Sequence, residues 1–138
     1  MREILFRGKR VDNGECVISN TFYQCDGKIK LWDEPNRDGY VEVDTETVGQ
    51  YTGLRDSKRT AEHPKGQMIF EGDIVKGLFR FYRPVNSVVA YSEGSFGLLW
   101  DRGGVETFWA FPTICNVEYE VIGNIHDNPE LLKGGGEE

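Results

Sequence analysis

Glycine divides this chain into short apolar runs, and that spacing constrains the fold more than any other feature of the sequence. The 138 residues include 17 glycines, with apolar runs of strand length between them. Short runs bounded by turn residues are typical of small barrels and sandwiches. We therefore expect a mostly β protein, and the length suits one domain or two small subdomains that share a core.

Turn signals place the first strands. Asp12-Asn13-Gly14 predicts a tight turn into a strand that runs from Cys16 toward Tyr23. Asp26-Gly27 predicts a two-residue hairpin turn, because both residues accept positive φ angles. The N-terminal part of the chain is therefore expected to be β-rich.

The strand after this hairpin alternates between polar and apolar residues. Lys28 and Lys30 face one side in this pattern, and Ile29 and Leu31 face the other. Such alternation is typical of a sheet with one face in water. Trp32 falls on the lysine side, where we expect it to cap an edge or to cover a neighbouring element.

The polar segment 55–66 has no periodicity and almost no apolar content, so we expect an exposed, mobile loop at the boundary between two halves. Residues 1–66 then form an N-terminal β-rich subdomain that carries this loop. Residues 67–127 hold four or five short strands, which suit an SH3-like small barrel. Residues 128–138 predict a short helical turn capped by Asn128, followed by a disordered tail.

Glu71-Gly72-Asp73 has both a structural and a catalytic interpretation. Gly72 permits a left-handed turn, and the Asp73 carboxylate can accept backbone N–H bonds where a strand begins. A catalytic carboxylate is the alternative. We favour the turn, because side chains of this kind commonly bond to nearby backbone.

The sequence shows no residue grouping typical of catalysis, metal binding or nucleotide binding. The cysteines Cys16, Cys25 and Cys115 fit neither a zinc ribbon nor a redox pair, and we interpret them as reduced thiols. His63 and His126 have no ligand neighbour at metal spacing. A phosphate-binding loop is also missing. We predict no catalytic, metal or cofactor site, and no enzyme activity.

The net charge of −7, with an isoelectric point near 4.9, means that the molecule as a whole repels phosphate backbones. Nucleic-acid binding is therefore disfavoured, although basic residues cluster locally. We favour solvated strand faces over a recognition surface for these residues. They are Arg2, Arg7, Lys9, Arg10, Lys28, Lys30, Arg80 and Arg83.

Aromatic residues are abundant in the second half of the chain. The neighbours Phe81-Tyr82 and Phe108-Trp109 point to opposite faces of their strands, so part of this ring surface should lie outside a barrel. We expect it to be buried against the N-terminal half or against another subunit. Stacking on nucleic-acid bases is the alternative use.

Charge interrupts the N-terminus where an export signal needs an apolar core. Apolar runs elsewhere are shorter than a membrane helix requires, and the mean hydropathy of −0.49 agrees. We expect a soluble, cytoplasmic protein without membrane contact.

Four separated blocks, in order along nearly the whole chain, resemble the YopX-like family of phage and prophage proteins. The blocks are residues 2–9, 47–54, 69–75 and 119–132. The resemblance implies an N-terminal β-rich part packed on an SH3-like barrel, and it carries no established activity. The chain departs from the family pattern at Cys16, where Trp is usual, at Thr45, where Pro is common, and in its longer 55–66 loop.

These observations favour a non-enzymatic accessory protein of a phage or prophage, located in the bacterial host cell. It would act through protein contacts, as a homo-oligomer and with an unknown phage or host protein. A nucleic-acid-associated small-barrel module is the alternative. A hydrolase with converging carboxylates has the least support, and its candidate residues are Glu71, Asp73, Glu118, Glu120 and Asp127.

Overall fold

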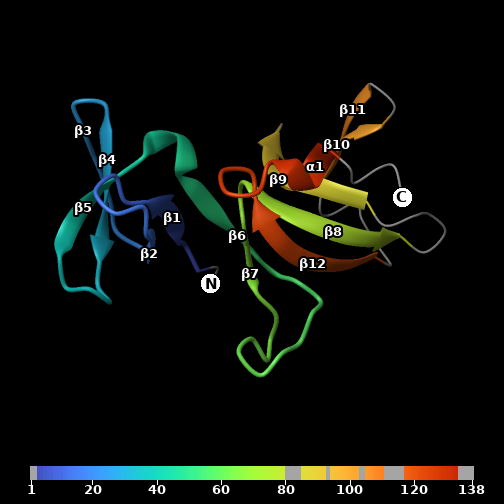
Figure 1. Ribbon diagram of the computed structural model, residues 1–138, viewed down its shortest axis with the longest axis horizontal. Coiled ribbons are helices and arrows are strands. Elements are labelled where there is room, and N and C mark those ends of the chain that lie inside the picture. The colour runs from blue at the N-terminus through green and yellow to red at the C-terminus, as the bar shows by residue number, and fades with distance from the viewer. Residues whose placement is uncertain (1–2, 80–84, 93, 103–104, 111–116, 134–138) are drawn as a thin grey trace. The chain divides into compact units, whose positions relative to one another are not determined.

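The chain forms a mostly β protein, as predicted (Figure 1). The computed structural model describes residues 3–79, 85–92, 94–102, 105–110 and 117–133. The chain divides into two compact units, Met1–Gly53 and Leu54–Glu138. The boundary falls inside strand β6 (Gly49–Arg55), so the 55–66 loop belongs to the second unit and not to the N-terminal subdomain in which we placed it.

A three-stranded antiparallel sheet in the first unit has the order β3-β4-β5. Its strands are β3 (Phe22–Cys25), β4 (Lys28–Asp33) and β5 (Gly39–Val43). The turn between β3 and β4 is the predicted Asp26-Gly27, with φ angles of 52° and 73°. The hairpin prediction is therefore confirmed.

A four-stranded sheet has the order β2-β1-β6-β7, formed by β1 (Phe6–Lys9), β2 (Cys16–Ser19), β6 and β7 (Met68–Phe70). A short 3-10 helix, η1 (Thr45–Thr47), precedes β6. The predicted continuous strand from Cys16 toward Tyr23 is wrong, because β2 ends at Ser19. The Ser19 Oγ accepts a hydrogen bond from the Thr21 N–H at 2.9 Å, and such local bonds compete with a strand ladder.

The alternation predicted along β4 is confirmed. Ile29 and Leu31 are buried in the core of the first unit, whereas Lys28 and Trp32 are exposed on the opposite face. The buried residues of this core are Val17, Ile29, Leu31, Val41 and Val43.

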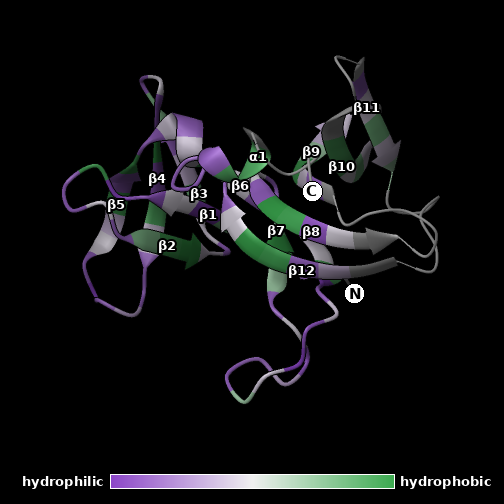
Figure 2. Cartoon of the chain, turned by 45° about the vertical axis from the view of Figure 1, so that its right-hand side comes forward, coloured by the Kyte–Doolittle hydropathy of each residue, from purple (hydrophilic) through white to green (hydrophobic). Residues whose placement is uncertain are grey.

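The second unit contains a five-stranded antiparallel sheet of order β11-β10-β9-β8-β12. Apolar residues of β8 and β12 lie side by side in it (Figure 2). Among the pairings of the described residues, β11 and β12 are the two sheet edges, so closure into an SH3-like barrel stays a prediction. The strands are β8 (Asp73–Phe79), β9 (Val85–Ser92), β10 (Ser95–Arg102), β11 (Val105–Ala110) and β12 (Val117–Asn124).

The core of this unit consists of Ile69, Val75, Val89 and Leu98, and Trp109 packs against it. Part of the predicted aromatic surplus is therefore core. Phe81-Tyr82 lie outside the described residues, so the expectation for those rings stays a prediction.

The chain's short helix, α1 (Glu130–Lys133), confirms the predicted helical turn. The Asn128 backbone carbonyl accepts from the Leu131 N–H at 3.1 Å, but its side chain bonds to the Asn124 N–H at 3.4 Å. Asn128 therefore ties the helix to the end of β12. The predicted tail at 134–138 lies outside the described residues, and within the described ones no helix has the length and apolar character of a membrane span.

Candidate functional site

An exposed cluster of aromatic rings lies on one face of the β3-β4-β5 sheet. Tyr23, Trp32 and Tyr40 are 48%, 40% and 46% exposed. The Tyr40 ring centroid lies 5.8 Å from that of Tyr23 and 5.2 Å from that of Trp32, which it meets edge to face. The three rings thus support one another while they remain open to solvent.

The strand register explains why these rings meet. Trp32 lies opposite Tyr40 across β4 and β5, and Tyr23 lies opposite Lys30 across β3 and β4. Residues opposite each other in an antiparallel pair share a face. The prediction that Trp32 lies on the lysine side is therefore confirmed.

The same face carries charges of both signs. Lys30 stands between Tyr23 on one neighbouring strand and Glu42 on the other, and Lys28 lies opposite the exposed Cys25. We call this set the aromatic face. Its residues are Tyr23, Lys28, Lys30, Trp32, Tyr40 and Glu42.

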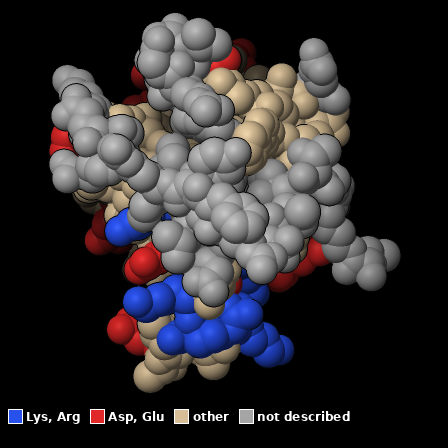
Figure 3. Space-filling model, turned by 90° about the vertical axis from the view of Figure 1, so that its right-hand side faces the viewer, with Lys and Arg blue, Asp and Glu red and all other residues tan. Residues whose placement is uncertain are grey.

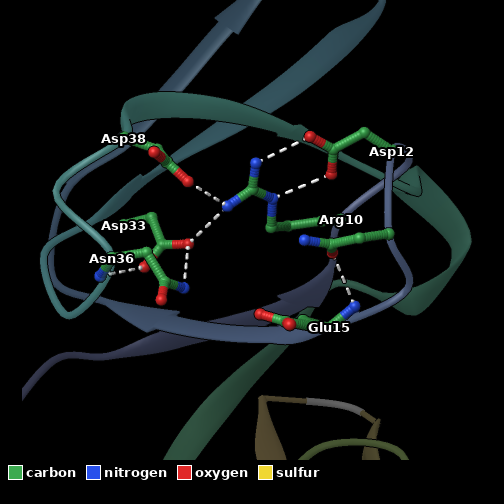
Figure 4. A network of polar contacts seen from close by, with 7 residues as sticks. Arg10, Asp12, Glu15, Asp33, Asn36 and Asp38 are labelled. Carbon is green, nitrogen blue, oxygen red and sulfur yellow. Dashed lines mark hydrogen bonds and ion pairs between the residues drawn. The ribbon is translucent and has the colours of Figure 1, made fainter.

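A buried arginine holds the turn that joins Trp32 to Tyr40 (Figure 4). Arg10 is 8% exposed, and its Nη1 donates to Asp33 Oδ2 at 3.0 Å and to Asp38 Oδ2 at 2.7 Å. Asp33 directly follows Trp32, and Asp38 lies two residues before Tyr40. Charge-assisted hydrogen bonds of this kind are strong, so Arg10 fixes both ends of the turn between the two rings.

The other side of the Arg10 guanidinium binds Asp12, whose two carboxylate oxygens accept from Nε at 2.8 Å and from Nη2 at 2.6 Å. This hydrogen bonding lowers the pKa of Asp12 below its ordinary value, and it raises the pKa of Arg10. The pKa of Asp33 is also lowered, first by the Asn36 side chain, which donates to it at 3.0 Å, and then by Arg10. Arg10, Asp12 and Asp33 therefore stay ionised at neutral pH.

Arg10 corrects one of our predictions. We expected it on a solvated strand face, or as part of a basic patch with its sequence neighbours. It is instead buried and paired with carboxylates that lie far along the chain, so it is not available to a polyanion. Arg2, the first member of that predicted patch, lies outside the described residues.

The loop 55–66 is exposed over most of its length, as predicted, but its base is anchored within the second unit. Asp56 is 1% exposed, and its carboxylate accepts from the Gln67 N–H and from the Val121 N–H, each at 2.9 Å. Ser57 exchanges two further hydrogen bonds with the Tyr119 backbone, at 2.8 and 3.0 Å. Polar composition predicted mobility and missed this anchoring.

The favoured interpretation of Glu71-Gly72-Asp73 is confirmed. Gly72 has a φ of 92°, and the buried Asp73 carboxylate accepts from the Phe70 N–H at 2.8 Å. Asp127 also has a structural partner, because it accepts from the Asn124 side chain at 3.1 Å. Two of the candidate acid or base residues are thus engaged in turns.

Of the remaining predicted residues, those that the structure describes form no recognisable centre. Cys16 and Cys25 are exposed, and His126 is exposed after β12. Cys115 lies outside the described residues. Within the described part of the chain, no group of three His, Cys, Asp or Glu residues is placed to hold a metal ion.

Comparison with known families adds one finding. A family model described as YopX protein matches residues 6–133. The matched segment begins with β1 and ends with α1, so it includes both compact units. No curated protein matches the chain.

Proposed function

Because the chain belongs to the YopX family, we propose that it is a non-enzymatic phage or prophage accessory protein that acts through protein contacts in the bacterial cytoplasm. Its partners in this proposal are a second copy of itself and a phage or host protein. The observation that carries the proposal is the aromatic face of the first unit, with its three exposed and mutually packed rings.

Trp and Tyr are enriched at the energetic centres of protein interfaces. The rings of this face already contact one another, and Arg10 holds the turn between two of them. Binding therefore orders few additional groups, and a smaller loss of side-chain freedom favours association.

Charge favours a second copy as the occupant. Lys28 and Lys30 lie on the aromatic face together with Glu42. A two-fold dimer places the same surface of both copies in contact, so a surface that carries both signs can complement itself. We propose that the dimer forms through this face.

The first experiment compares Trp32→Ala and Tyr40→Ala with the wild type by sedimentation velocity over a range of concentrations. We expect a wild-type dimer, and we expect each variant to weaken association by roughly 30-fold or more, since a central aromatic anchor contributes about 2 kcal/mol or more. Tyr91→Ala is the matched control, because Tyr91 is an exposed ring in the second unit, 56% exposed and edge to face with Phe96.

Two outcomes would contradict the proposal. A wild type that stays monomeric at every concentration removes the homo-oligomer. Variants that dimerise as well as the Tyr91→Ala control show that the dimer uses another surface.

A charge experiment tests the two-fold arrangement separately. The double variant Lys28→Glu/Lys30→Glu has an acidic aromatic face, and Glu42→Lys has a basic one. We expect each to associate poorly with itself and the mixture to form a heterodimer, because opposite faces attract and like faces repel. A mixture that stays monomeric contradicts self-complementary charge.

A nucleic-acid-associated module is the second candidate function. The observation that favours it is the local excess of positive charge in residues 55–66, on a chain whose net charge is −7. It is separable from the first candidate, because the aromatic face belongs to the first unit and this loop to the second.

A further inference from the structure

We propose that the loop 55–66 is a phosphate-binding element that contacts the backbone of a nucleic acid. The proposal does not depend on dimerisation through the aromatic face. It rests on the exposed charge of the loop, on the anchoring of its base and on the residue types that it presents.

The loop presents cations with almost no exposed counter-charge. Its two acidic residues are Asp56 and Glu62. Asp56 is 1% exposed and accepts backbone hydrogen bonds, so Glu62 is the carboxylate that the loop leaves in solvent. The four exposed cations are Arg55, Lys58, Arg59 and Lys65. Figure 3 shows Lys and Arg side chains gathered at the lower end of the view, where the loop between β6 and β7 lies in Figure 1.

Hydrogen bonds within the loop position its two arginines. Arg55 Nη1 donates to the Gly66 carbonyl at 3.0 Å, and Arg59 Nη1 donates to the Asp56 carbonyl at 2.7 Å. A guanidinium has five N–H donors, so each arginine keeps further donors for a ligand. Their positions are set before binding, which lowers the entropy cost of contact.

The residue types favour phosphate over a protein surface. Ala61 and Pro64 are the most apolar residues of the loop, and it contains no aromatic residue that could anchor a protein interface. Phosphate contacts instead use Arg and Lys together with hydroxyl groups, which Ser57 and Thr60 supply.

The acidic remainder of the chain determines from which side a polyanion can approach. With a net charge of −7, most of the surface repels a polyanion. A nucleic acid is therefore expected to approach by the loop, with weak, strongly salt-dependent binding of about 10⁻⁴ to 10⁻⁶ M at physiological salt.

The test measures fluorescence anisotropy of a labelled DNA duplex, titrated with the full chain between about 50 and 200 mM salt. The variant Lys58→Gln/Lys65→Gln removes two charges whose side chains make none of the loop's described hydrogen bonds, so the loop keeps its anchors. Because each lost duplex phosphate contact reduces the salt slope by about 0.9, we expect a slope reduced by about 1.8 and at least tenfold weaker binding at the lower salt.

Two control variants test whether the effect is specific to the cations of the loop. Arg37→Gln/Lys76→Gln removes the same charge from exposed residues outside both the loop and the aromatic face, and it should leave binding within about twofold, as expected for a non-specific change outside the contact. Glu62→Gln removes the exposed carboxylate of the loop and should strengthen binding. A circular dichroism melt confirms that each variant is folded.

The proposal is overturned if the wild type does not bind duplex at low salt, or if Lys58→Gln/Lys65→Gln and Arg37→Gln/Lys76→Gln weaken binding equally. A poly-glutamate competitor tests the alternative that the loop binds acidic proteins. Equal binding of duplex and poly-glutamate at matched charge would assign the loop to acidic proteins and contradict the nucleic-acid proposal, whereas preference for the duplex supports it.

Discussion

Asp73 begins strand β8 as a buried carboxylate, 1% exposed, that accepts from the Phe70 N–H at 2.8 Å. Its removal leaves that N–H without this partner inside the protein. We expect Asp73→Ala to lower the free energy of unfolding by about 1–3 kcal/mol. Asp73→Asn keeps an acceptor oxygen and should cost less. Urea unfolding followed by circular dichroism measures both, and equal losses would contradict the hydrogen-bond explanation.

Arg10 depends on its planar fork of donors. Its guanidinium reaches Asp12 on one side and Asp33 with Asp38 on the other. A lysine ammonium is a point charge and cannot make this set of bonds, although the net charge is unchanged.

We therefore expect Arg10→Lys to lower the melting temperature and to weaken self-association, because the turn between Trp32 and Tyr40 loses its support. Differential scanning calorimetry and sedimentation velocity measure the two effects. Arg37→Lys is the matched control, since Arg37 is an exposed residue of the same turn. Equal melting temperatures for both variants would show that the Arg10 network does not stabilise the fold.

These two residues also show what sequence can predict at this scale. Gly72 and Asp73 are adjacent, and the bond to Phe70 closes within one turn, so residue type and order suffice. Arg10 donates hydrogen bonds to Asp33 and Asp38, which lie 23 and 28 residues further along the chain. Their meeting depends on how β4 and β5 pack, which no local pattern encodes.

Among the elements, hairpins with a specific turn dipeptide were predictable. Asp26-Gly27 fixed the register of β3 and β4, and this register places Tyr23 beside Lys30. The aromatic face was only half predicted. Trp32 followed from the alternation of β4, but its contact with Tyr40 required the register of β5, which begins after a polar loop.

Loop 55–66 shows a different limit. Its exposure follows from composition, whereas its anchoring depends on Asp56, which reaches the distant strand β12 through the Val121 N–H. The burial of a single aspartate within a polar segment cannot be predicted from its sequence neighbours. The loop was therefore expected to be mobile, although its base is held from both sides.

Gly66, at the end of this loop, is constrained both by its left-handed backbone conformation and by a close approach to a neighbouring backbone atom. Comparison of two glycine substitutions can separate the two effects. Its φ is 92°, and a Cβ at this position would lie 2.2 Å from the Asp56 carbonyl oxygen. Gly94 has a φ of 85° with nothing within 4 Å of a Cβ, so Gly94→Ala carries the conformational cost alone.

We expect Gly94→Ala to lower the free energy of unfolding by about 1–2 kcal/mol, the cost of a left-handed conformation. Gly66→Ala should cost more, and it should also weaken duplex binding, because the Asp56 carbonyl that positions Arg59 must move. Urea unfolding and anisotropy measure the two effects. Equal destabilisation by the two variants would show that the close approach at Gly66 relaxes freely.

At the scale of the whole molecule, two effects of pH act in opposite directions. Acidification from neutral pH reduces the net charge of −7 toward zero near the isoelectric point of about 4.9, which relieves self-repulsion. The Arg10 network acts further into the acid range. The pKa values of Asp12 and Asp33 are lowered in the folded chain, so their stabilising effect is present above the ordinary value of 3.8 and is lost as the pH falls through the folded values.

We therefore expect the melting temperature to be highest near pH 5 and to fall steeply below about pH 4. Asp33→Asn should flatten the acid limb, that is, the fall of the melting temperature below about pH 4. The reason is that it removes one of the two carboxyl groups whose pKa is lowered in the folded chain. Glu34→Gln removes an exposed carboxylate next to it and should leave the limb unchanged. Calorimetric scans from neutral to strongly acidic pH measure this, and identical acid limbs for the two variants would contradict the assignment.

The boundary at Gly53–Leu54, inside β6, has a consequence for how such a protein can evolve. Modules are exchanged between genes most readily where a flexible linker tolerates a crossover. Here a crossover between the units falls inside a strand of a hydrogen-bonded sheet, so a recombinant must form β6 from two parental sequences. The aromatic face and the basic loop are therefore expected to be inherited together, in keeping with a family match that covers residues 6–133, from β1 to α1.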